Sequence, residues 1–63
     1  MFQFRTASIT FQEADFGGRT VTDLFRVLVV PDHFPEDYQE DEVAGALWEG
    51  GIRNFKVISW SWA

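Results

Sequence analysis

One stretch of the chain concentrates its ionisable side chains, and almost all of them are acids. Between Arg26 and Arg53 there is no Lys or Arg, but there are seven carboxylates: Asp32, Glu36, Asp37, Glu40, Asp41, Glu42 and Glu49. A concentrated negative charge repels nucleic acids and membranes and attracts basic protein surfaces. These acids therefore predict a basic macromolecular partner, and we expect them to bind it.

The same acids also have a purely structural explanation. Asp37 at a helix N-cap and Glu40 three residues later would form a capping box, and acids in a first helical turn interact favourably with the helix dipole. Capping does not account for Asp32 or Glu36, or for the lack of any compensating base in the stretch. The sequence leaves both explanations open.

The chain has few of the residue types and spacings that catalytic and metal-binding sites use. There is no Cys and one histidine, His33, and the acids around it lack the ligand spacing of a calcium loop. The serines have no nucleophile-elbow signature, and a domain this small has little room for a pocket in which Asp32 and Glu36 could act as acid and base. We therefore expect no catalytic residue, no metal site and no cofactor, and predict that the protein is not an enzyme.

Tryptophans supply a second candidate binding feature. Trp48 belongs to an apolar helical stripe, and Trp60 and Trp62 share one face of a predicted strand. These rings would either lie in the core or anchor an interface, because large aromatic side chains dominate both settings. We expect Trp48, Trp60 and Trp62 to contribute apolar contacts to partner binding. Direct binding of nucleic acid is disfavoured by the net charge of −5.

Periodicity predicts the elements that position these side chains. Residues 2–11 and 20–30 predict two strands joined by the Gly17-Gly18 turn, and residues 52–62 predict a third. An acidic loop ending at Gln39 precedes a helix, whose expected features are a Gly50-Gly51 cap and an apolar stripe of Val43, Ala44, Leu47 and Trp48. We predict a single domain over residues 1–63. Its fold class is α+β, a small β-β-α-β domain with a three-stranded, mainly antiparallel sheet and one helix on one face.

Finer features are also predicted. Residues 20–30 are apolar on both faces, which is typical of a central strand. The apolar face of residues 2–11 changes midway, which a bulge near Ala7 would explain. Gly45 inside the helix predicts a close approach to the sheet. Phe55 and Val57 should face away from Ile58, Trp60 and Trp62. One helix cannot cover two apolar sheet faces, so an alternative function is a self-associating structural or accessory module whose aromatic face forms a homodimer.

At the level of a class, the chain resembles the small, acidic, Cys-free proteins that bacteriophages encode to disable host machinery, such as anti-CRISPR proteins and phage inhibitors of host RNA polymerase. The resemblance lies in the β-β-α-β layout, the acidic stretch Pro35–Glu42, the short helix segment Val43–Trp48 and the end directly after the last strand. It implies stoichiometric binding that blocks a nucleic-acid-binding surface, with carboxylates in the place of phosphates, and no catalysis.

The expected compartment is the cytoplasm, which is that of the host cell if a phage encodes the protein. Residues 1–5 lack the basic and apolar regions of a signal peptide. The longest apolar run, Val27–Val30, is far shorter than the roughly 18 residues of a membrane helix.

Overall fold

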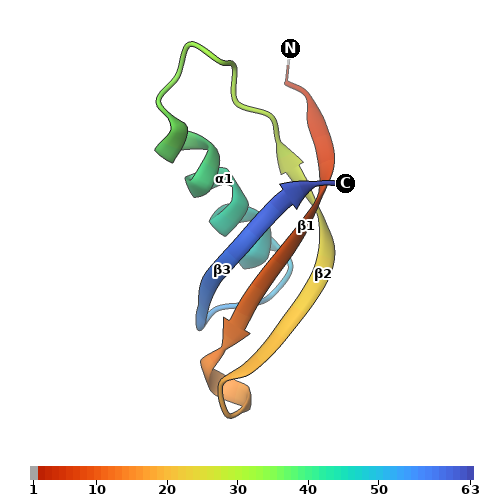
Figure 1. Cartoon of the computed structure of the whole chain (residues 1–63), viewed down its shortest axis with the longest axis vertical. Helices are drawn as coiled ribbons and strands as arrows, with labels where there is room; N and C mark the ends of the chain where they lie inside the picture. The colour runs from red at the N-terminus through yellow and green to blue at the C-terminus, as the bar shows by residue number, and fades with distance from the viewer. Residues whose placement is uncertain (1) are drawn as a thin grey trace.

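The structure, a computed structural model, describes residues 2–63 apart from the side chain of Phe16. Three antiparallel strands form one sheet, and one helix packs against it (Figure 1). The strands are β1 (Phe4–Glu13), β2 (Arg19–Leu28) and β3 (Phe55–Trp62); a 3-10 turn, η1 (Ala14–Phe16), follows β1, and the helix α1 spans Glu36–Glu49. The predicted α+β class and β-β-α-β order are confirmed.

The hairpin of β1 and β2 closes through the two glycines. Gly17 and Gly18 have φ angles of +72° and +76°, in the left-handed region that glycine adopts at little cost. The Gly18 N–H donates a hydrogen bond to the Glu13 carbonyl at 3.0 Å, and the Gln12 side-chain amide donates one to the Gly18 carbonyl at 2.9 Å. The predicted Gly-Gly turn is therefore confirmed.

The strand order is β2-β1-β3, so the first strand is central and β2 lies at an edge. The prediction that residues 20–30 form a central strand is wrong. Phe25 and Val27 pack with the core, whereas Leu24 on the opposite face is 61% exposed. Apolar residues on both faces of a strand therefore do not require a partner strand on each side.

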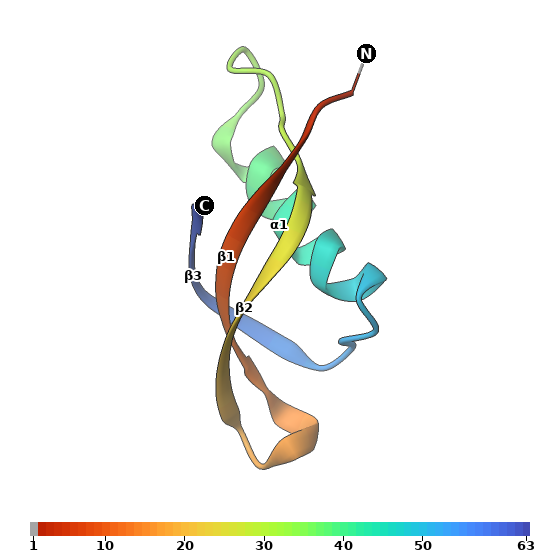
Figure 2. The same cartoon turned by 90° about the vertical axis from the view of Figure 1, so that its right-hand side faces the viewer.

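A β-bulge occurs in β3 and not near Ala7, as the sequence predicted. The β1–β2 register is unbroken along both strands. On the other side of β1, Thr10 pairs with Ser59 but Phe11 pairs with Val57, which leaves Ile58 as the extra residue. The extra residue resets the alternation of side chains, and β3 bends along its length (Figure 2).

The bulge overturns the predicted faces of the last strand. Phe55, Val57, Trp60 and Trp62 are all half-buried against the core, so the four share the helix-facing side of the sheet. Ile58, by contrast, is 54% exposed. The prediction that the two tryptophans face away from Phe55 and Val57 is therefore wrong.

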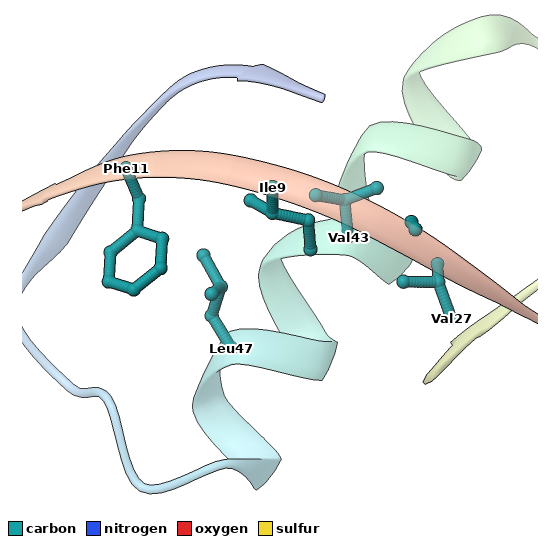
Figure 3. Close-up of a cluster of buried hydrophobic side chains, with 6 residues drawn as sticks. Ile9, Phe11, Val27, Val43 and Leu47 are labelled. Atoms are coloured by element: carbon teal, nitrogen blue, oxygen red, sulfur yellow. The ribbon is translucent and has the colours of Figure 1, made fainter. Parts of the chain in front are cut away.

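The core lies between the sheet and α1 (Figure 3). Its fully buried side chains come from β1, β2 and α1: Ala7, Ile9, Phe11, Val27, Val43 and Leu47. Phe11 meets Phe25 edge to face, with 5.9 Å between the ring centroids. Val43 and Leu47 confirm two positions of the predicted helical stripe, whereas Trp48 is half exposed.

The two ends of α1 differ in how well they were predicted. The helix begins directly after Pro35, and no side-chain hydrogen bond caps it, so the predicted capping box of Asp37 and Glu40 is absent. At the other end Gly51 has a φ of +89°. The Ile52 N–H donates to the Leu47 carbonyl at 3.1 Å and the Gly51 N–H to the Trp48 carbonyl at 3.0 Å. This pair of bonds is a Schellman motif and confirms the glycine cap.

Gly45 does not mark a close approach of the helix to the sheet. It is exposed, and a Cβ atom placed on it would meet nothing within 4 Å. The prediction of a tight helix–sheet contact at this residue is therefore wrong, and packing does not require a glycine there.

Candidate functional site

The predicted acidic residues form one surface along α1 and the loop that precedes it. Six of the seven are exposed and Glu42 is half-buried; we call Asp32, Glu36, Asp37, Glu40, Asp41, Glu42 and Glu49 the acidic surface. Within residues 2–63, no salt bridge reaches any member of this set, whereas Glu13 in the hairpin lies 3.7 Å from Arg19. The acidic surface therefore presents uncompensated charge to the solvent.

The acids flank the helix on both sides. Glu40 lines a groove between α1 and β3 together with Val57 and Trp60. Glu42 and Glu49 line a groove on the β2 side together with Arg26. A partner that covers α1 would consequently meet carboxylates from either direction.

Two basic side chains stack on tryptophans. The guanidinium carbon of Arg53 lies 4.2 Å from the centre of the Trp48 ring, and Arg53 Nη1 donates a hydrogen bond to the Trp48 carbonyl. The guanidinium of Arg5 lies 5.2 Å from the Trp62 ring. These cation–π contacts engage both arginines with tryptophan rings, and neither forms a salt bridge with the acidic surface among the described residues.

The structure separates the three tryptophans that we expected to bind a partner. Trp48 belongs to α1, is 52% exposed and lies next to Glu49 in the chain. Trp60 and Trp62 meet edge to face at 5.0 Å and are half-buried against the core. Trp48 is therefore the most exposed of the three beside the acidic surface, although Arg53 stacks on its ring.

The sheet face that α1 leaves open carries mainly hydroxyl side chains, together with the exposed Leu24 and Ile58. Strand register and alternation place on it a set of hydroxyl side chains: Thr6, Ser8, Thr10, Thr20, Thr22, Ser59 and Ser61. Thr10 and Thr22 are hydrogen-bonded through their hydroxyls at 2.9 Å. The expected aromatic pair is absent from this face, because the bulge at Ile58 turns Trp60 and Trp62 toward the helix; Leu24 and Ile58 are its exposed apolar side chains.

Gln39 is a position that the sequence did not mark as important. Its side-chain Oε1 accepts a hydrogen bond from the Val30 N–H at 2.9 Å, and its Nε2 donates one to the Leu28 carbonyl at 2.7 Å. Its position four residues before Val43 and eight before Leu47 is the signal that could have identified it, because these three residues share one helix face. Gln39 fixes the start of α1 to the end of β2.

An apolar groove beside the acidic surface was also missed. It has a volume of about 280 Å³ and is lined by Phe2, Leu28, Val29, Val30, Pro31, Phe34, Tyr38 and Glu42; we call it the aromatic groove. The N-terminal residues and the loop before α1 lie at the same end of the molecule in both views (Figures 1 and 2). The signal in the sequence was the pair Phe34 and Tyr38, which frames the start of the helix.

In the described part of the chain, no three His, Asp or Glu side chains are grouped so that they could hold a metal ion. No helix of residues 2–63 combines the length and the apolar character needed to cross a membrane. Comparison of the chain with protein-family models, with curated proteins and with solved structures gives no match.

Proposed function

We propose that this domain is a non-catalytic inhibitor that binds a basic, nucleic-acid-binding surface of a host protein or complex in the cytoplasm of the host cell. This is the mode of action of the phage-encoded proteins that its sequence resembles. The observation that carries the proposal is the acidic surface: six of its seven residues are exposed, and none forms a salt bridge among the described residues.

The density of charge along α1 is close to that of a nucleic-acid strand. Six carboxylates lie on the 14 residues of α1, which span about 20 Å at 1.5 Å per residue. One strand of B-DNA carries a phosphate about every 3.4 Å, or about six over the same length. Five of the six lie between Glu36 and Glu42, so a protein groove lined with Lys and Arg would meet most of this charge at the first turns of α1.

Unpaired acids at this density repel one another, and the domain tolerates that repulsion without an N-terminal cap on the helix. A bound basic surface would relieve the repulsion and gain attraction at the same time. Exposed charges at the rim of an interface mainly steer encounter. Binding should consequently weaken as salt rises, chiefly through slower association.

The test compares two variants with equal changes in charge. Glu36→Gln, Asp37→Asn and Asp41→Asn remove three charges from the acidic surface. Glu13→Gln, Asp15→Asn and Asp23→Asn, as the control, remove three charges from the hairpin region.

Tagged copies of the wild type and both variants are used to capture partners from host cells, and duplex DNA is added as a competitor. We expect the wild type and the control to retain a nucleic-acid-binding protein that DNA displaces, and the first variant to lose it. Equal capture by both folded variants would refute the proposal. Capture of the same chain alone would instead support the homodimer alternative.

A further inference from the structure

The aromatic groove exposes an unusual amount of aromatic surface for a domain of this size. Phe2 is 81% exposed, Tyr38 52% and Phe34 44%, and all three line the same groove. Clustered apolar surface of this kind is typical of interaction sites on soluble proteins.

Local hydrogen bonds hold the groove in shape. The Phe34 N–H donates to the Pro31 carbonyl at 3.0 Å, and the Tyr38 N–H donates to the Pro35 carbonyl at 3.1 Å. The rings of Phe34 and Tyr38 meet edge to face with 5.5 Å between centroids. Binding of a ligand would therefore cost little conformational entropy, because the loop does not have to be ordered on binding.

The strand side of the groove is fixed as well. Leu28 and Val30 are both hydrogen-bonded through their backbones to the Gln39 side chain. The Val29 N–H donates to the Gln3 carbonyl at 2.7 Å, which holds the N-terminal segment that carries Phe2 against the end of β2. Each wall is thus tied to the sheet or to the helix.

The charge around the aromatic groove is negative, which disfavours a negatively charged occupant. Glu42 lines it, no Lys or Arg does, and the exposed acids Asp32, Glu36, Asp37 and Asp41 occupy the same loop and the first turns of the same helix. An anionic lipid surface would be repelled. A second copy of the chain, with its own net charge of −5, would be repelled as well.

We infer that the aromatic groove receives one large apolar side chain from a Lys- or Arg-rich segment of the partner, whose flanking charges meet the acidic surface. This inference rests on the proposed function and adds a specificity element to it. The charges attract any basic segment, and the groove distinguishes those that carry a bulky apolar residue between the bases.

The test uses three synthetic peptides and NMR spectra of the isotope-labelled protein. The peptides are Lys-Lys-Trp-Lys-Lys, Lys-Lys-Ser-Lys-Lys and Glu-Glu-Trp-Glu-Glu. We expect the first to shift the methyl signals of Leu28, Val29 and Val30 and to bind about tenfold more tightly than the second, since burying an aromatic side chain contributes at least this factor. The acidic peptide should not bind.

Variants link the effect to the groove. Phe34→Ser should reduce the affinity for the Trp peptide to that for the Ser peptide. Leu24→Ser removes another exposed apolar side chain, from the open sheet face, and should leave both affinities unchanged. Tyr38→Ser provides a second groove variant if Phe34→Ser perturbs the fold.

The outcomes distinguish a failure of the groove inference from a failure of the proposed function. If both basic peptides bind equally and shift only the acidic surface, the groove inference is overturned and the proposed function stands. If neither basic peptide binds, both fail. Equal binding of the acidic Trp peptide overturns the charge selection. Groove signals that shift with protein concentration alone would show that a second copy occupies the groove, which also overturns the inference.

Discussion

Gln39 and Val30 are joined by a hydrogen bond that closes part of a sheet edge. The Gln39 Oε1 accepts from the Val30 N–H at 2.9 Å, while its Nε2 donates to the Leu28 carbonyl at 2.7 Å. The side-chain amide thus takes the place that the backbone of a further strand would occupy beside β2. Open edges are sites of aggregation, and here the first turn of α1 protects the edge.

Gln39→Ala should destabilise the domain by about 1–3 kcal/mol, because it leaves a half-buried donor and acceptor without partners. Urea denaturation measures the loss, and faster hydrogen exchange at the Val30 amide would localise it. Gln12→Ala, which removes an exposed hydrogen bond to Gly18, is the control and should cost less. Equal losses in the two variants would show that Gln39 has no special role.

Gly45→Ala should stabilise the domain by about 0.5–1 kcal/mol, since alanine favours the helix and its Cβ meets nothing within 4 Å. Gly51→Ala should instead destabilise it by about 1–2 kcal/mol, because the φ of +89° is unfavourable for a residue with a Cβ. Thermal unfolding of both variants checks the pair. A lower melting temperature for Gly45→Ala would mean that the helix is constrained at this residue.

Deletion of Ile58 should be tolerated. Val57 would still pair with Phe11 and Ser59 with Thr10, now without a bulge, so Trp60 and Trp62 would keep their side of the sheet. Deletion of Ser61 is the matched change and should turn Trp62 outward, because Trp60 and Trp62 would become neighbours in a regular strand. Near-ultraviolet circular dichroism should retain the tryptophan-pair signal in the first variant and lose it in the second.

Leu47→Ala should remove most of the stability. A chain of this length has a free energy of unfolding of about 3–9 kcal/mol, and truncation of a fully buried Leu costs about 2–5 kcal/mol. Leu24→Ala, on the open face, should change stability by less than about 1 kcal/mol. Guanidinium unfolding followed by tryptophan fluorescence compares them, and similar midpoints would contradict the assignment of the core.

The sequence predicted local features well and non-local ones poorly. The Gly17-Gly18 turn, the helix and its Gly51 cap depend on neighbouring residues, and all three are present. Strand order depends on whether β3 pairs with β1 or with β2. The hydrophobic periodicity of the sequence does not indicate which pairing occurs. The bulge at Ile58 likewise arises from pairing with Thr10 and Phe11, and it decides which face the tryptophans occupy.

The candidate site was predictable in its charges but not in its shape. The seven acids were evident from composition, and the structure places them along α1 and its preceding loop. The aromatic groove was not, since Phe2 joins Phe34 and Tyr38 in its lining only after the start of the chain has paired with the end of β2. Gln39 was missed because its role requires a partner in another element.

The central position of β1 has a consequence for biosynthesis. Its second neighbour is β3, which pairs Ala7 with Trp62, so the chain as far as Trp62 must leave the ribosome before the sheet can close. Until then β1 keeps an open edge, and a hairpin with one partly covered face is only marginally stable. Formation of the sheet should therefore wait for the synthesis of β3, and a nascent chain stalled before β3 would be exposed to chaperones and proteases.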